Sequence, residues 1–216
     1  MQIAPISRME TNMSRRQMWD ERYAAKDLVW SAGPNELFAQ EIDDLQPGKA
    51  LDVACGEGRN GLWLAERGWS VTMLDFSAVA IDKARQIAEK RGVKVNALVE
   101  DVAVYELPEA EYDLVAVLYL HTQPDERSRW LANVIRSVRP GGTFLYVGHD
   151  PSNIEMGVGG PQDVQLLPGI SELNQALDGF RIDAAEVRPR NVGSDPGHGS
   201  AATGIALDTF IRAVRQ

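Results

Sequence analysis

One short glycine-rich segment constrains the fold of this chain more than any other feature. Residues 50–61 read Ala-Leu-Asp-Val-Ala-Cys-Gly-Glu-Gly-Arg-Asn-Gly, so an apolar run that carries Asp52 leads into glycines at positions 56, 58 and 61, and a helical pattern follows. Glycines let the backbone approach a ligand, and the first turn of the helix offers unpaired N–H groups to an anionic part of it. The order strand, glycine turn and helix therefore predicts a nucleotide-binding unit.

The rest of the chain predicts an α/β protein with a doubly wound, mostly parallel, seven-stranded sheet. Apolar runs alternate with helical patterns, which favours parallel strands joined by right-handed crossovers. No helix fits between the last two apolar runs, so these strands are expected to form a C-terminal antiparallel hairpin. The expected strands are about 49–54, 70–74, 93–99, 112–120, 143–148, 180–188 and 201–214.

The N-terminal part is expected to cover the sheet rather than to join it. We assign residues 1–14 to a flexible tail and residues 15–216 to a single domain. Within that domain, residues 15–48 are predicted to form two helices, the first capped by Ser14 and the second ended by Pro47 and Gly48.

Composition excludes several classes of function. Acidic residues exceed basic ones by 31 − 22 = 9, which disfavours binding to the phosphates of a nucleic acid. There is no apolar run of about 18 residues, so we expect no membrane span. The single cysteine, Cys55, excludes an internal disulfide and suits a cytoplasmic protein. We therefore expect a small-molecule partner, and the composition does not determine the oligomeric state.

The glycine spacing alone does not identify the ligand, because Gly56, Gly58 and Gly61 also fit the dinucleotide fingerprint. Asp52 favours another ligand, since a carboxylate beside the turn disfavours a pyrophosphate and favours a cationic group. S-adenosylmethionine carries an α-ammonium and a sulfonium with a single carboxylate. The alternative is that Asp52 only caps the turn through backbone amides.

At this point the sequence resembles the class I S-adenosylmethionine-dependent methyltransferases. The resemblance lies in the segment Leu51 to Asn60 and in Arg139-Pro-Gly-Gly-Thr-Phe, and it is strongest over residues 15–150. The segment Met18-Trp-Asp-Glu-Arg-Tyr, the aromatic-serine pair at Trp30 and the Gly-Arg-Asn triplet resemble the tellurite-resistance and thiopurine-type branch. Members of that branch methylate small, soft or heteroatom-bearing molecules, and their N-terminal helix folds over the cofactor.

The resemblance and the strand ends together predict the cofactor site. Asp75 ends the second strand and is expected to accept hydrogen bonds from ribose hydroxyls, while Phe76 covers the adenine. The resemblance implies that an acid at the end of the third strand binds the adenine amino group. The expected cofactor-binding residues are Trp19, Tyr23, Trp30, Asp52, Ala54, Cys55, Gly56, Gly58, Arg59, Asn60, Asp75, Phe76, Ser77, Glu100, Asp101, Val102, Leu118 and Tyr119.

Several of these residues also have structural interpretations. Trp19 and Tyr23 are spaced as residues that pack a helix onto the sheet, so they are expected either to form part of a lid or to belong to the core. Arg59 either faces the methionine carboxylate or is an ordinary surface residue, and Glu100-Asp101 either binds adenine or starts a solvated loop. Cys55 lies where a nucleophile would be activated, but the tight turn also needs a small residue there.

The catalytic residues stay open at this level. An activated methyl donor needs only a close and aligned acceptor, whereas a hydroxyl acceptor also needs a base. His121 and His149 follow the fourth and fifth strands and are candidate bases, or else structural histidines; His198 is a weaker candidate. The loop 150–161 is a candidate lid or substrate wall. No acid cluster indicates a metal site.

Three functions remain compatible with the sequence. The first is methyl transfer from S-adenosylmethionine to a small thiol, oxyanion or other heteroatom nucleophile. The second is an NAD(P)-dependent oxidoreductase that uses the glycine turn for pyrophosphate, and the third is a non-catalytic S-adenosylmethionine-binding protein. The tetrapeptide Leu118 to His121 stands where enzymes that methylate adenine or amide nitrogens have Asn/Asp-Pro-Pro-Tyr, which argues against such acceptors.

Overall fold

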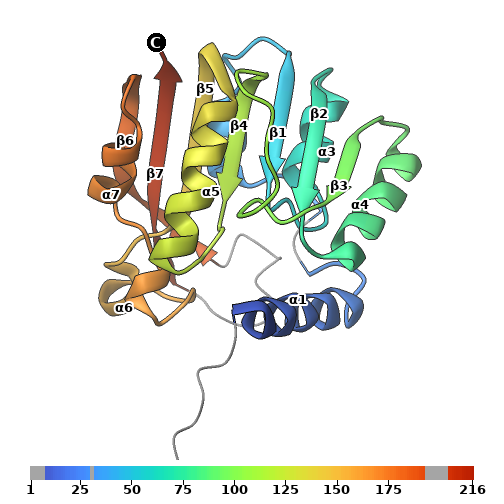
Figure 1. Cartoon of the computed structure of the whole chain (residues 1–216), viewed down its shortest axis with the longest axis horizontal. Coiled ribbons are helices and arrows are strands. Elements are labelled where there is room, and N and C mark those ends of the chain that lie inside the picture. Colours follow the sequence, from blue (N-terminus) through green and yellow to red (C-terminus); the bar gives the residue numbers. More distant parts are fainter. Residues whose placement is uncertain (1–7, 30–31, 193–203) are drawn as a thin grey trace, which may run out of the picture.

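The computed structural model describes residues 8–29, 32–192 and 204–216, and its central feature is one seven-stranded sheet (Figure 1). The strand order is β3-β2-β1-β4-β5-β7-β6. Strands β1 to β5 are parallel, and β7 is antiparallel to both β5 and β6. The prediction of a mostly parallel sheet that ends in an antiparallel pair is therefore confirmed.

After α1 and α2, strands and helices alternate along the chain to the end of β5, except that a loop without a helix joins β3 to β4. The strands are β1 Lys49–Val53, β2 Ser70–Asp75, β3 Asn96–Val99, β4 Tyr112–Leu118, β5 Val138–His149, β6 Phe180–Asn191 and β7 Ile205–Arg215. The helices are α1 Arg8–Ala24, α2 Glu36–Glu41, α3 Arg59–Glu66, α4 Ala78–Arg91, α5 Pro124–Ser137, α6 Asn153–Met156 and α7 Ile170–Ala176, with a short 3-10 helix at Val164–Leu166.

Helices cover both faces of the sheet because side chains alternate between its faces along each strand. Ala50 belongs to the core beneath α2, α3 and α4, which contribute Phe38, Leu62 and Ile81 among others. The next residue, Leu51, belongs to the core beneath α5 and α7. Two apolar layers thus hold the central strands, and the carboxyl ends of those strands are left to form a site.

Helix α1 lies outside these two layers, beyond the carboxyl ends of the central strands and at the same end of the sheet as α6 (Figure 1). Arg15 donates two hydrogen bonds to the carboxylate of Glu126 on α5, of 2.7 and 2.6 Å. On the other side, the hydroxyl of Ser77 donates to Asp20, and the ammonium of Lys83 donates to the carbonyl of Tyr23. These contacts place α1 across the end of the sheet where the glycine turn lies.

Several predicted boundaries were wrong, each for a local reason. Helix α1 begins at Arg8 rather than after Ser14, so residues 8–14 of the predicted tail are helical, and residues 1–7 lie outside the described part. Strand β3 begins at Asn96 rather than at 93, because the N–H of Val93 still donates to Ala88 in the C-terminal cap of α4.

The strand ends near the site also differ from the prediction. Strand β4 ends at Leu118, because Tyr119 has a positive φ of 55° and leaves the extended conformation. Strand β5 begins at Val138 rather than at 143, because Val138 already pairs with Tyr112. Residues 139–142 form an irregularity within the strand. The predicted loop 150–170 contains two short helices, and β6 continues to Asn191. The start of the last predicted strand, 201–203, lies outside the described residues.

Candidate active site

A cavity of about 460 Å³ opens at the carboxyl ends of β1, β2, β4 and β5, under α1. Its walls come from four strand ends, from α1 and from the loop after β5. The predicted site residues that line it are Trp19, Tyr23, Asp52, Ala54, Cys55, Gly56, Arg59, Asn60, Asp75, Phe76, Leu118, Tyr119, His121 and His149. Arg15, Arg22 and Leu120 also line it and were not predicted from the sequence. Gly160 and Pro161 line it as well, and they belong to the loop 150–161 that the sequence indicated as a candidate lid or substrate wall.

The glycine turn after β1 has the geometry that its sequence predicts. Gly56 and Gly58 have positive φ angles of 55° and 78°, a region that disfavours a side chain. Gly61 is needed for a different reason, since a Cβ there would stand 2.5 Å from the sulfur of Met73. Ala54 also has a positive φ, of 52°, so the backbone holds an unfavourable conformation at the cavity wall.

Asp52 is buried in this turn with only part of its hydrogen-bonding capacity used. Its Oδ2 accepts a hydrogen bond of 2.8 Å from the N–H of Gly61, whereas its Oδ1 is buried and has no hydrogen-bond partner among the described residues. Burial raises the pKa of Asp52 to about 7, against the hydrogen bond from Gly61 and the charge of Arg59. Asp52 therefore caps the turn with one oxygen and leaves the other for a ligand.

Asp75 ends β2 and is also buried against the cavity. Its Oδ2 accepts from the N–H of Gly56 and its Oδ1 from the N–H of Ser77, each at 2.9 Å. Burial raises the pKa of Asp75 despite these two bonds. Ser77 itself caps α4 through the N–H of Ala80 and does not line the cavity. Asp75 keeps lone pairs for further donors, and its contact with a ribose stays a prediction.

Phe76 lines this cavity, but other residues of the predicted cofactor site do not. Glu100, Asp101, Val102 and Gly58 are absent from its walls. Asp101 accepts a hydrogen bond from the N–H of Ala103, which fits the start of a turn. The roles assigned to these residues therefore stay predictions, and Trp30 and His198 lie outside the described residues.

The aromatic residues of α1 pack against α4 and also line the cavity. Trp19 and Tyr23 stack with their ring centroids 5.6 Å apart, and Tyr23 packs with Val29 and Ala80. Both also line the cavity. The packing role is therefore confirmed, and a role in a lid stays a prediction. Next to them, the guanidinium of Arg15 lies 5.2 Å from the centroid of the Phe76 ring.

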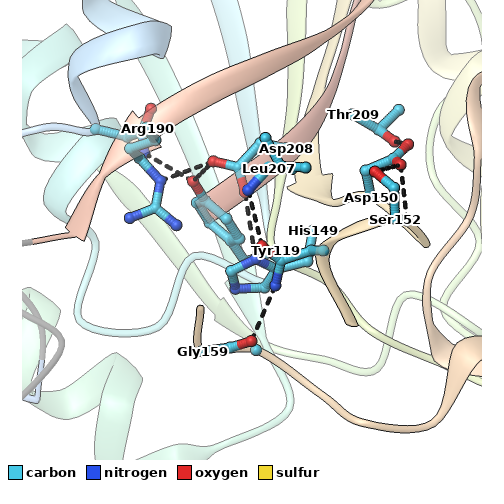
Figure 2. A network of polar contacts seen from close by, with 12 residues as sticks. Tyr119, His149, Asp150, Ser152, Gly159, Arg190, Leu207, Asp208 and Thr209 are labelled. Atoms are coloured by element: carbon cyan, nitrogen blue, oxygen red, sulfur yellow. Dashed lines mark hydrogen bonds and ion pairs between the residues drawn. The ribbon is translucent and has the colours of Figure 1, made fainter. Parts of the chain in front are cut away.

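A third buried carboxylate, Asp208 on β7, organises the opposite end of the cavity (Figure 2). Its Oδ2 accepts hydrogen bonds from the hydroxyl of Tyr119 at 2.8 Å and from Nε of Arg190 at 2.7 Å. Its Oδ1 lies 3.3 Å from Nδ1 of His149. Burial alone would raise the pKa of Asp208, but the nearby His149 ring and the hydrogen bonds from Arg190 and Tyr119 hold it below its usual range.

Asp208 and Arg190 were not predicted from the sequence, because the neighbours of their side chains depend on the order of the strands in the sheet. The one available signal was an acid in the apolar stretch 204–211 of the last strand. Buried charged residues are rare unless they are paired, so an acid within an apolar strand is a candidate site residue.

The two candidate histidines lie side by side but in different surroundings. The rings of His121 and His149 stack at 5.5 Å with an angle of 16° between their planes. Burial lowers the pKa of His121 to about 3, and the neighbouring His149 adds to this effect. Nε2 of His121 is buried with no hydrogen-bond partner in the described structure. His121 is thus a neutral ring at physiological pH, whereas His149 contacts a carboxylate.

Cys55 lies in the turn after β1, where the sequence predicted either a nucleophile or a small residue that the turn requires. Burial raises the pKa of its thiol well above the usual range, and the charges of Asp52 and Asp75 add to the shift. The thiol is therefore protonated at neutral pH, which disfavours the nucleophile interpretation.

Comparison with known proteins agrees with this geometry. Residues 50–142 match the family described as "Methyltransferase domain". The chain is 35% identical over 142 residues to an uncharacterized methyltransferase of Synechocystis, an alignment that covers 62% of this chain and 65% of the relative. It is 28% identical to the 2-heptyl-1-hydroxyquinolin-4(1H)-one methyltransferase of Mycobacteroides abscessus, over 67% of this chain and 65% of the relative.

The match to the methyltransferase domain thus lies over the central part of the chain, from β1 into β5. Solved structures share its fold over most of the chain. A structure reported under "Conversion of a Disulfide Bond into a Thioacetal Group during Echinomycin Biosynthesis" aligns with a TM-score of 0.74 at 21% identity, covering 94% of this chain and 93% of that one. TehB from Haemophilus influenzae aligns with a TM-score of 0.71 at 17% identity, covering 85% and 63%. The curated relatives are aligned over about two thirds of their own length.

Two features are absent from the described residues, namely a membrane-spanning helix and a metal-binding cluster. None of the helices in the described part is long and apolar enough to cross a bilayer. Within the same residues, no group of three or more His, Cys, Asp and Glu side chains is arranged to hold a metal ion.

Proposed function

We propose that this protein transfers a methyl group from S-adenosylmethionine to a heteroatom of a small molecule. The observation that supports it most directly is Oδ1 of Asp52, a buried carboxylate oxygen at the cavity wall with no protein partner. An unpaired buried acceptor costs free energy, so it favours a ligand that brings a donor or a positive charge to that point. The α-ammonium of S-adenosylmethionine is such a group.

The remaining walls fit the same cofactor. Asp75 lies one strand away from Asp52 and offers carboxylate lone pairs to ribose hydroxyls, and Phe76 offers an aromatic face. The positive φ angles of Gly56 and Gly58 keep side chains off the ligand path between the two acids. Asp52, Asp75 and the turn between them would hold the methionine and ribose parts, and the bound cofactor supplies an activated methyl group.

The chain contributes position and shielding rather than activation of the donor. Helix α1 covers the cavity, held by Arg15 to α5 and by Asp20 to Ser77, and the loop after β5 closes the side at Gly160 and Pro161. Holding two reactants close and aligned contributes about 7–11 kcal/mol to lowering a barrier. In the strand order β2-β1-β4-β5, the donor would lie over β1 and β2 and the acceptor over β4 and β5.

The acceptor is proposed to be small, on three grounds. The cavity of about 460 Å³ must hold both reactants. The acidic composition disfavours nucleic acid. The name of the relative from Mycobacteroides abscessus describes methylation of a hydroxyquinolinone. We also propose, from the N-terminal motif with Trp19 and Tyr23, that the chain belongs to the tellurite-resistance and thiopurine-type branch and acts in the cytoplasm.

The oxidoreductase alternative is weaker in this structure. A pyrophosphate would need the N–H groups of the glycine turn, but the N–H of Gly61 donates to Asp52 and that of Gly56 donates to Asp75. Two carboxylates thus occupy the donors that the dinucleotide fingerprint would use, and their negative charges would repel phosphate.

Calorimetry with S-adenosylmethionine, S-adenosylhomocysteine and NAD tests this proposal. We expect binding of the first two and none of NAD. Asp52→Asn keeps the shape of the side chain and is expected to weaken the binding of S-adenosylmethionine by about 1.5–3 kcal/mol, the usual contribution of a hydrogen bond to a charged group. Asp82→Asn, an exposed acid on α4, is the matched control and should bind as the wild type does. Tight binding of NAD alone would refute the proposal.

Methyl transfer itself separates an enzyme from a binding protein. Incubation with tritiated donor and a panel of thiols, phenols, amines and oxyanions is expected to label at least one class. Binding without any transfer across the panel would favour the non-catalytic alternative.

A further inference from the structure

The contacts of His149 distinguish it from every other polar group at the acceptor end of the cavity. It ends β5, two strands away from Asp52 in the sheet order, and therefore lies on the acceptor side of the site. Its Nδ1 is 3.3 Å from Oδ1 of Asp208, a carboxylate with no exposed surface. An ionised carboxylate at Nδ1 favours the tautomer that carries its proton there, which leaves Nε2 as an acceptor.

The ring of His149 lines the cavity, and so does Gly160. Gly160 has a φ of +75°, and a Cβ at this position would stand 2.9 Å from Nε2 of His149 and 2.6 Å from Cδ2, so the loop after β5 packs closely against the imidazole and needs a glycine there. An acceptor would reach Nε2 from the cavity that the ring lines.

The surroundings hold Asp208 in its charged form. Tyr119 from the end of β4 and Arg190 from β6 both donate to its Oδ2. Asp150, the residue after His149, faces away from this pair and accepts from Ser152 and Thr209. Burial of a charge is costly unless donors surround it, and four elements of the sheet contribute to this arrangement. Tyr119 takes part from a backbone with φ of 55°, a conformation usually retained at functional positions.

We propose that His149 is the general base of this site, held in its reactive tautomer by Asp208, and that the acceptor is a small molecule with a hydroxyl group that is protonated at neutral pH. This inference rests on the proposed methyl transfer. The acceptor oxygen forms a bond to the methyl carbon, and the carbon–sulfur bond breaks with its electron pair left on sulfur. The hydroxyl proton moves to Nε2 of His149, and the carboxylate of Asp208 balances the positive charge of the imidazolium.

His121 is excluded from the same role by its position. No carboxylate contacts its ring, its Nε2 is buried away from a donor, and the guanidinium of Arg127 lies near enough to disfavour a second charge. Stacked on His149, it serves as a neutral wall of the acceptor subsite.

The test compares two acceptors in wild type and His149→Gln. The first, 1-naphthol, has a protonated hydroxyl at neutral pH, and the second, thiophenol, reacts as a thiolate that needs no base. We expect kcat with 1-naphthol to fall by roughly 10²–10⁴-fold, the usual contribution of a general base, and kcat with thiophenol to change far less. His121→Gln is the matched control and is expected to change both rates by the same factor. An equal loss on both acceptors in His149→Gln, or no loss with 1-naphthol, would overturn the inference.

A second readout needs no acceptor. Nitrogen-15 NMR of histidine-labelled protein, with His149 assigned by its loss in His149→Gln, is expected to show the proton of the neutral ring on Nδ1. Asp208→Asn should lose this preference and reduce the 1-naphthol rate in the same direction as His149→Gln. A wild-type ring protonated on Nε2 would refute the dyad.

Affinity for S-adenosylhomocysteine keeps the two proposals apart. We expect His149→Gln and Asp208→Asn to bind it as the wild type does, which also shows that the variants are folded. Binding with an unchanged 1-naphthol rate rejects only the base, whereas no binding in the wild type rejects the proposed function.

Discussion

Each end of the cavity buries a carboxylate, but the pKa of the carboxyl group shifts in opposite directions at the two ends. At the β1 end, Asp52 has one N–H donor and one unpartnered oxygen, and burial raises its pKa to about 7. At the β5–β7 end, Asp208 is equally hidden, yet Tyr119, Arg190 and His149 surround it and its pKa stays low. The number of donors, rather than burial, decides the charge state.

This difference distinguishes the Asp52 end, where a ligand would bring a positive charge to the carboxylate, from the Asp208 end, where protein groups already surround the carboxylate. At the β1 end, Oδ1 of Asp52 has no donor among the described residues, and a cationic ligand would supply one. At the β5–β7 end, Asp208 already accepts from Tyr119 and Arg190, so the protein itself fixes the geometry beside the acceptor. Four predictions test this contrast, from the largest expected effect to the smallest.

Removal of Asp208 should have the largest effect on folding. Asp208→Ala leaves the buried Arg190 without its carboxylate, and breaking a buried ion pair costs about 3–5 kcal/mol of unfolding free energy. Urea denaturation monitored by circular dichroism measures this loss. Arg181→Ala, which breaks an exposed pair with Asp183, is the control and should cost less than about 1 kcal/mol. Equal losses in the two variants would remove the distinction drawn for the β5–β7 end.

Asp52→Asn should do the opposite and stabilise the free protein near neutral pH. The folded state raises the pKa of Asp52 from 3.8 to about 7, so it binds more protons than the unfolded state in that interval. The contribution of Asp52 to the free energy of unfolding is therefore fully present below about pH 4 and is lost as the pH rises to about 7. This contribution is up to roughly 4 kcal/mol. Urea midpoints measured across this interval should fall in the wild type and stay flatter in Asp52→Asn.

The same carboxyl should make cofactor affinity depend on pH. A cationic ligand needs the ionised form of Asp52, whose pKa is about 7 in the free protein. Association of S-adenosylmethionine is expected to strengthen by up to about tenfold per pH unit below that value and to level off above it, with release of a proton on binding. Calorimetry in buffers of different ionisation enthalpy measures that proton. A pH-independent affinity in wild type would contradict the role of Asp52.

The smallest effect is expected at the cover of the cavity. Arg15→Ala removes two hydrogen bonds between α1 and Glu126, a partly exposed pair worth about 1 kcal/mol. Hydrogen exchange of α1 should become faster and the affinity for S-adenosylhomocysteine should fall slightly, while the urea midpoint stays close to that of the wild type. A large loss of stability would show that α1 belongs to the core rather than to the cover.

Much of the β1 end could be predicted from the sequence because its signals are local. The glycines, Asp52 and the helix start of α3 lie within a dozen residues, and Asp75 follows the next strand. The β5–β7 end brings together residues 119, 149, 190 and 208, which are separated by 89 positions at the extremes. No local pattern marks such a cluster, so only His149 and Tyr119 were found.

The sequence by itself determined the order of strands and helices, the turn at Gly56 to Gly61 and the acids that face a ligand there, because periodicity and backbone freedom act over short distances. The tertiary structure decided which histidine contacts a carboxylate, which oxygen of Asp52 remains unpartnered, and where α1 covers the cavity. Those outcomes depend on strand pairing and on burial, and both arise only when distant segments pack together.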